Sequence, residues 1–236
     1  MIEANISHFH ISKLKICIWI APPNPNTELC LNMADKKSIL IRYTLYTLLL
    51  LLLGGFLNYV AGWGDTGQFK EGGIVECLQL AVLCVSAALM MAAAMRRKPE
   101  AKFFPVITAF AAMLAMVREC DALLDQAIPA GGWKTPAAIL VVSAILLAWY
   151  NRRIFGRELA RFAATPVFAL MWAGLMVVIY GQLTGHGPFL EPLLGDDYAR
   201  DYKRLLEESL EMLGYFFILV AGIELFLEHG NPPDTN

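Results

Sequence analysis

Five polar residues interrupt four long apolar segments of the chain at nearly the same depth. They are Asn58, Gln79, Arg118, Glu119 and Glu211. At about 1.5 Å per helical residue, each lies about 24–26 Å from the end of its segment that is expected to face the cytoplasm. Ionisable groups are costly in hydrocarbon, and those that occur there usually face a cavity or an ion path. The pattern therefore predicts an intramembrane pocket that binds or moves a cation, a proton or a cationic solute.

Four further acids extend this predicted pocket. The full set is Asn58, Glu76, Gln79, Arg118, Glu119, Asp121, Glu207, Glu208 and Glu211. Glu76 lies one helical turn from Gln79, so the two share a helix face, and Asp121 stands in the same relation to Arg118. We expect these turns to form a shallower acidic mouth above the deep group.

The last apolar segment carries three acids close together. The i, i+4 spacing places Glu207 and Glu211 on one face, whereas Glu208 is expected to point aside, toward Arg204 and Glu211. Arg118 cannot lose its proton, so it is the expected counter-ion inside the pocket. Like charges held close in a low dielectric cannot all ionise, and some acids must be protonated, hydrated or balanced by a bound cation.

The chemistry available to such a pocket is that of oxygen ligands. The sequence contains no HExxH motif, no Cys/His cluster and no CxxC pair, so imidazole or thiolate metal sites are not indicated. Carboxylates alone suit a hard divalent cation such as Ca²⁺, Mg²⁺ or Mn²⁺. Glu76, Glu119 and Glu211 are the candidate ligands, and no other cofactor is indicated.

The polar residues also have structural explanations. Glu76, Asp125 and Glu207 lie near the ends of their segments, where acids can simply reach lipid headgroups and water. Arg118, Glu119 and Glu211 lie deeper, and for them the structural alternative is a buried ion-pair network that holds the helices together.

The elements that position these residues are long and apolar. The chain has 236 residues, of which 57% are hydrophobic and 17% are charged, whereas a soluble domain has about 25% charged residues. A membrane-spanning helix needs about 20 apolar residues. Six segments are predicted to span, approximately residues 39–63, 73–95, 103–126, 136–150, 163–183 and 205–227. The expected fold is an all-α, polytopic membrane bundle with the first, second, third and sixth segments as its core.

Basic residues predict the direction of the bundle. Eleven lysines and arginines lie on the side that holds both termini, and five lie on the opposite side. The positive-inside rule then places the amino and carboxyl termini in the cytoplasm. We expect the host membrane to be the cytoplasmic membrane of a bacterium, with the polar pocket facing outward.

The ends of the chain are expected to lie outside the bundle. Residues 1–32 are interpreted as a disordered or mis-called extension, because Met33-Ala34-Asp35-Lys36-Lys37 resembles a natural start. Residues 33–229 form the predicted membrane domain, and 230–236 form a short tail.

Three functions are compatible with this organisation. The first is a non-enzymatic membrane protein whose acidic pocket binds or transports a cation or cationic solute. The second is a membrane-embedded enzyme that acts on a lipid or envelope substrate with paired carboxylates or a metal. The third is a structural or accessory subunit whose polar layer only fixes the helices. The bilayer is the expected partner, and no basic stripe indicates nucleic acid.

Overall fold

A computed structural model describes residues 33–70, 72–98, 101–184 and 200–228, together with Pro192 and Gly195. The regular elements of this part are helices: α1 (Met33–Ala61), η1 (Thr66–Phe69), α2 (Ile74–Arg96), α3 (Phe103–Glu119), α4 (Asp121–Ala127), α5 (Lys134–Tyr150), α6 (Arg152–Ala163), α7 (Pro166–Thr184) and α9 (Arg200–Leu227). The predictions for residues 1–32 and 230–236 lie outside the described residues.

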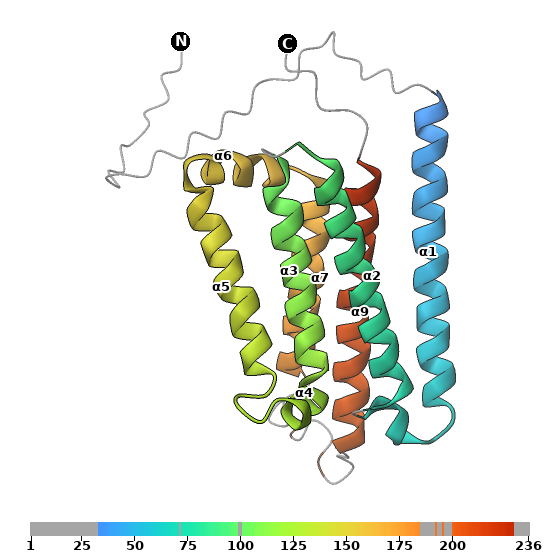
Figure 1. The fold of residues 1–236 in the computed structure, drawn as a ribbon. Coiled ribbons are helices and arrows are strands. Elements are labelled where there is room, and N and C mark those ends of the chain that lie inside the picture. The colour runs from blue at the N-terminus through green and yellow to red at the C-terminus, as the bar shows by residue number, and fades with distance from the viewer. Residues whose placement is uncertain are drawn as a thin grey trace, which may run out of the picture. The chain divides into compact units, whose positions relative to one another are not determined.

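The chain divides into two compact units, Met1–Thr44 and Leu45–Asn236, and the division falls within α1. The described residues of the first unit belong to α1. Within it, the Thr44 hydroxyl donates to the Leu40 carbonyl at 2.8 Å. The second unit contains all the other described elements, and the following paragraphs describe this unit (Figure 1).

Four helices are long and apolar enough to cross a membrane. They cover Lys37–Ala61, Gly67–Arg96, Pro166–Thr184 and Asp201–Leu227. Two bent pairs of helices meet the same criteria when each pair is counted as one span, which raises the number to six. The prediction of an all-helical fold with membrane-spanning segments is confirmed at this level.

The third predicted segment, 103–126, is not one straight helix. α3 ends at Glu119, and the chain bends by 75° into α4. The bend is held beyond α4, where the Asp125 carboxylate accepts a hydrogen bond of 3.1 Å from the backbone N–H of Trp133. Gly132 adopts a positive φ of 52°, and a Cβ at this position would collide with the Asp125 carboxylate. The break places Glu119 at the end of a helix.

The link between the fourth and fifth predicted segments is also helical. α6 follows α5 after a bend of 104°, and it lies across the ends of the neighbouring helices (Figure 1). Asn151 terminates α5, because its side-chain amide donates to the Leu147 carbonyl at 2.8 Å. α6 is absent from the six predicted segments, because it lies between the fourth and the fifth of them.

The closest helix packing is between α7 and α9. At their crossing, a Cβ added to Gly214 would lie 2.8 Å from the carbonyl oxygen of Gly174, so glycine is required for this approach. α2 packs on α9 and α3 on α2, and the buried core includes Leu83, Met90 and Tyr215. α7, the fifth predicted segment, therefore belongs to the core, where the first segment was expected.

The part of α1 within the second unit has few buried residues. Val60 is fully buried, in a small cluster with Phe69, Val75 and Met212. Near its other end, the Tyr46 hydroxyl donates to Glu224 on α9 at 2.7 Å. α5 is also peripheral, since Ala137 is its one buried residue, and this agrees with its predicted position at the outside of the bundle.

A short turn connects α1 to α2. Asp65 caps η1 and accepts hydrogen bonds of 2.9 Å from the side chain of Gln68 and from the backbone N–H of Gly67. These two bonds lower the pKa of the Asp65 carboxyl. The turn thereby holds Phe69 in its buried position.

Candidate functional site

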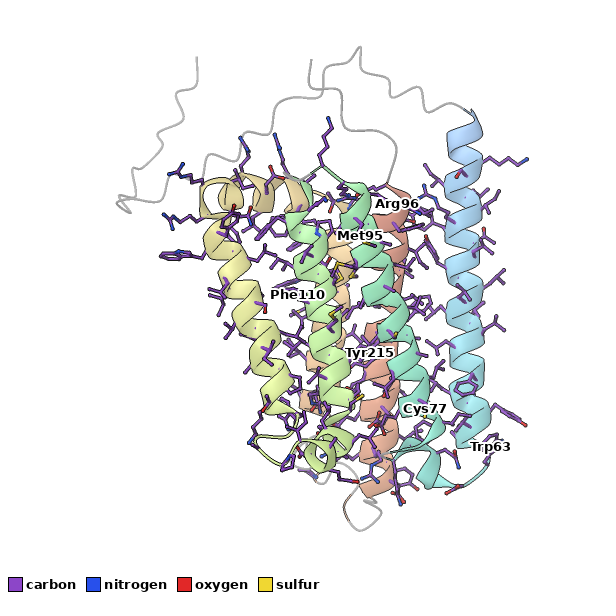
Figure 2. All side chains as sticks on the ribbon, viewed as in Figure 1. Trp63, Cys77, Met95, Arg96, Phe110 and Tyr215 are labelled. Atoms are coloured by element: carbon purple, nitrogen blue, oxygen red, sulfur yellow. The ribbon has the colours of Figure 1, made fainter. Side chains whose placement is uncertain are left out.

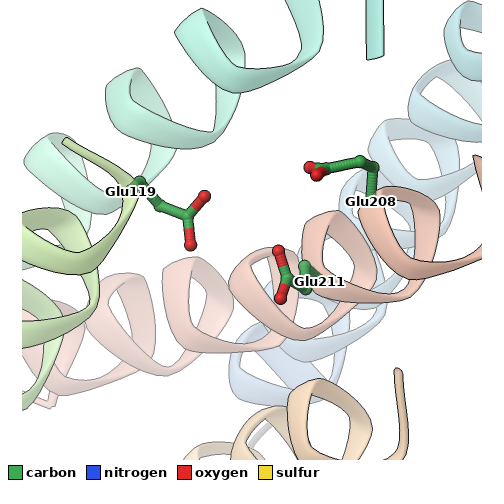
Figure 3. Close-up of side chains that lie close together, drawn as sticks. All are labelled: Glu119, Glu208 and Glu211. Carbon is green, nitrogen blue, oxygen red and sulfur yellow. The ribbon is translucent and has the colours of Figure 1, made fainter. Parts of the chain in front are cut away.

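Three carboxylates converge between α3 and α9. One oxygen from each of Glu119, Glu208 and Glu211 lies within 4.8 Å of the others, and the three side chains point toward a common space (Figure 3). The side chains of Glu211 and Glu119 are 3% and 9% exposed. We call these three residues the carboxylate cluster. Such a group can share protons or hold a metal ion.

The helices present the cluster through their spacing. Glu208 and Glu211 are i, i+3 on α9, so they lie on one face one turn apart. Glu119 is the last residue of α3, and the backbone bends after it into α4. The Glu119 side chain reaches α9, where it contacts Tyr215. Figure 2 shows Tyr215 on α9, between Cys77 near one end of the bundle and Arg96 near the other.

Each carboxylate accepts a hydrogen bond from a different neighbour. The Tyr215 hydroxyl donates to Glu119 Oε1 at 2.7 Å. The Gln79 amide on α2 donates to Glu208 Oε2 at 2.9 Å. The Gln182 amide on α7 donates to Glu211 Oε1. Four helices thus contribute polar side chains to one network.

Arg118 is the cation of the cluster. Its Nη1 lies 3.4 Å from Glu211 Oε1 and 3.7 Å from Glu119 Oε1. Half of the Arg118 side chain is exposed, so it borders the cluster from the outside. Among the described residues, three carboxylates therefore face one guanidinium. With every acid ionised, the group carries a net charge of −2, which protons or a bound cation must compensate.

Gln79 supplies a second observation at the same place. Its side chain is fully buried, and its Oε1 has no hydrogen-bond partner within the described part of the chain. The amide orientation follows from Glu208, which requires the nitrogen as its donor. A buried acceptor without a donor costs about 1–3 kcal/mol. A water molecule or a cation beside Oε1 would satisfy it.

The other predicted pocket residues lie elsewhere. Glu76 accepts a hydrogen bond of 2.6 Å from the backbone N–H of Gly72 and so caps the start of α2. Glu207 lies 3.9 Å from Lys203, in an i, i+4 pair on α9. Asp121 occupies the first turn of α4, and Asn58 is exposed.

The structure therefore corrects which acid joins Glu211. Glu208, expected to point aside, forms the cluster, whereas Glu207 pairs with Lys203. The predicted metal ligands Glu119 and Glu211 lie together, and Glu208 takes the third place that was assigned to Glu76. Gln79 and Arg118 contact the cluster as expected.

Two residues of the network were not predicted as part of the site. Tyr215 follows Glu211 at i+4, so a search for hydroxyls on the same helix face would have found it. Gln182 lies near the end of the α7 span, where a polar residue is unremarkable. Its contact with Glu211 depends on the close approach of α7 and α9, which sequence spacing does not show.

An apolar groove of about 420 Å³ lies beside the site. It is lined by Leu80, Ala81, Cys84, Met116, Val117, Cys120 and Leu124. Cys120, the residue after Glu119, belongs to this lining, and Leu124 on α4 continues it. Its lining suits a hydrocarbon chain rather than a polar ligand.

Fold and site together define a class: an all-helical protein with four to six candidate membrane-spanning helices and a carboxylate cluster among them. No protein-family model, curated protein or solved structure matches the chain.

Proposed function

We propose that this protein binds a hard divalent cation at Glu119, Glu208 and Glu211. The observation that carries the proposal is the charge balance of the cluster, in which three carboxylates face one guanidinium. One divalent cation neutralises the remaining charge of −2. A buried excess of negative charge without such compensation would be strongly unfavourable.

The spacing of the ligands suits one cation that is bound by oxygen atoms. One oxygen of each carboxylate lies within 4.8 Å of the others. Oxygen ligands bind Ca²⁺ at about 2.3–2.6 Å, so three oxygens this close to one another are near enough to share an ion. The orphaned Oε1 of Gln79 is a neutral oxygen at the same place.

The site belongs, in this proposal, to a six-span protein of a bacterial cytoplasmic membrane with both termini inside. The basic residues that flank α2, α3, α5 and α7 at one end favour a cytoplasmic position for that end. Glu119 lies at the opposite end of α3 from Lys102. The cation would therefore enter from the outside of the cell.

Calorimetric titration of the purified full-length chain with Ca²⁺ tests the proposal. We expect Glu208→Gln and Glu211→Gln each to weaken binding by at least about tenfold, because loss of even an indirect ligand contact has that effect. Glu207→Gln is the matched control, since Glu207 is on the same helix but pairs with Lys203. Equal affinity in all three variants, or no binding by the unchanged protein, would sink the proposal.

A membrane-embedded enzyme with a lipid substrate is the second candidate. It is supported by the apolar groove whose lining includes Cys120, the residue after Glu119, and by the short separation of the carboxylates. In this reading an acyl chain lies in the groove and the cluster supplies an acid, a base or a metal. Incubation with bacterial lipids and mass spectrometry should then show a converted lipid that Glu119→Gln does not produce. Identical lipid profiles from both proteins would leave cation binding without an enzymatic role.

A further inference from the structure

α6 presents a row of arginines on one face. Arg153, Arg157 and Arg161 are spaced i, i+4 and i+8 and are exposed, so they form one stripe along the helix. Arg152 adds a fourth exposed charge at the start of the helix. The cation site described above does not involve this surface.

The opposite face of α6 is aromatic and packs on the bundle. The Phe155 ring lies 5.6 Å from that of Phe103 at the start of α3. The Phe162 ring stacks on Phe104 with centroids 4.9 Å apart. These contacts fix the rotation of α6 about its axis, and the arginine stripe faces away from the bundle.

α6 itself carries little negative charge that could neutralise the stripe. Glu158 is the one acid in α6, and its Oε1 lies 2.9 Å from Arg161 and 3.5 Å from Arg157. Three positive charges of the helix remain after this carboxylate is counted. Lys98 is also exposed, between α2 and α3 at the same end of the bundle.

The position of α6 relates it to a membrane surface. The helix connects α5 to the candidate span α7. α5 reaches the length of a span only when it is counted together with α6, and α6 turns away from it by 104°. At the end of α5, Trp149 and Tyr150 are 67% and 86% exposed, and such aromatics are enriched at membrane–water interfaces. The Arg152 guanidinium lies over the Trp149 ring at 4.9 Å. An amphipathic basic helix with these neighbours has the features of an interfacial helix.

We propose that α6 lies at the membrane–water interface and that its arginines bind the phosphate groups of anionic phospholipids. The argument rests on charge complementarity, since guanidinium groups bind phosphate in bidentate geometry. It also rests on continuity with a candidate span, because α7, which follows α6 in the chain, is long and apolar enough to cross a membrane. The arginines would then hold the basic end of the bundle at a defined level in the bilayer.

Fluorescence quenching by brominated lipids tests this inference on the full chain. The protein is reconstituted in equimolar phosphatidylcholine and phosphatidylglycerol, with bromine on one lipid or the other. The signal of Trp149 is the difference between the unchanged protein and Trp149→Phe. At low salt we expect brominated phosphatidylglycerol to quench Trp149 at least about fivefold more than brominated phosphatidylcholine does. This preference should fall as salt is added.

Matched variants show whether the arginines cause the preference. In the double variant Arg153→Gln/Arg157→Gln, the ratio of quenching by the two lipids should fall close to one. In Arg153→Lys/Arg157→Lys, most of the preference should remain. Lys134→Gln, at the other end of α5, should leave it unchanged. Equal quenching by the two lipids in the unchanged protein overturns the proposal and leaves the stripe for an acidic protein partner. A preference that is insensitive to salt also overturns it, even where the glutamine variant does not fold.

Discussion

At Arg118 the two main explanations of the polar layer make opposite predictions. The guanidinium lies within 3.7 Å of both Glu119 and Glu211. If the cluster only locks the helices together, nothing can compensate for the loss of the Arg118 guanidinium. If the cluster binds a divalent cation, the cation can replace the lost positive charge.

We therefore expect Arg118→Gln to lower stability by about 1–3 kcal/mol without divalent cations, less than for a fully buried pair because half of the side chain is exposed. Added Ca²⁺ should restore most of this loss and should bind more tightly than to the unchanged protein, because a repelling charge is gone. Thermal unfolding in detergent with Ca²⁺ or with a chelator measures both effects. A loss that Ca²⁺ does not restore would favour the purely structural explanation.

Residue types and depth were sufficient to predict part of the site. Gln79, Arg118, Glu119 and Glu211 are uncommon in apolar helices, and all four belong to one network. Glu207 and Glu208 both belong to the predicted pocket, and the sequence does not show that Glu208 is the one beside Glu119 and Glu211, because this depends on how α9 is rotated against its neighbours. That rotation is set by the contact of Gly214 with α7, which is tertiary information.

At the scale of the elements, glycine decides how closely two helices approach. A Cβ on Gly214 would lie 2.5 Å from Val178 Cγ2, inside van der Waals contact. Adjacent glycines such as the Gly54-Gly55 pair in α1 often allow close helix contact, yet a Cβ at either position meets nothing within 4 Å. The two glycine sites therefore differ in their tolerance of a methyl group.

Gly214→Ala should destabilise the protein by about 1–3 kcal/mol, because the core must expand to accept it. It should also weaken cation binding, since the same α7–α9 contact brings Gln182 to Glu211. Gly54→Ala should be neutral or slightly stabilising, because alanine favours a helix by up to about 1 kcal/mol. Thermal unfolding and Ca²⁺ titration of both variants provide the comparison. Equal stability of the two variants would contradict the packing described for α7 and α9.

The elements that sequence patterns did not predict are the bent ones. Hydrophobic length identifies segments that can span a membrane, but it does not report the bend at Cys120, which depends on the loop contact between Asp125 and Trp133. α6 was missed for a different reason. The i, i+4, i+8 spacing of its arginines is present in the sequence, but these residues were used as evidence for orientation and not as a helix face.

At the scale of the whole molecule, orientation links the two proposals. The cation site and the arginine stripe lie at opposite ends of the bundle, since Glu119 ends α3 and Phe103 at its start contacts α6. In the orientation proposed above, the stripe lies in the cytoplasmic leaflet and the cluster lies on the outer side.

Cysteine labelling in intact cells tests this orientation. In a background without native cysteines, Lys134→Cys should react with a membrane-impermeant maleimide, and Arg157→Cys should react only after the cells are permeabilised. Both positions are exposed, so a difference reports sidedness and not burial. The reverse pattern would place the cluster on the cytoplasmic side.

Charge balance across the whole site makes a last prediction about protons. Without a cation, the two negative charges that Arg118 leaves uncompensated must be balanced in another way, and protons are the available ions. Binding of one divalent cation should then displace up to about two protons, since metal ligands must be deprotonated. The groups that contact the cluster are Arg118, Tyr215, Gln79 and Gln182. The carboxylates of Glu76 and Glu207 also act on it electrostatically.

Calorimetry in buffers of different ionisation enthalpy measures the number of protons released, and the affinity for Ca²⁺ should fall as the pH is lowered from about 8 to 5 because protons compete for the carboxylates. Glu119→Gln should release fewer protons than the unchanged protein, and Glu207→Gln should release the same number. Release of no protons together with an affinity independent of pH would mean that the empty site is already neutral. A site that exchanges protons for a divalent cation on the outer side has the charge balance that an electroneutral exchanger requires, because the net charge of the binding region is the same in both occupied states.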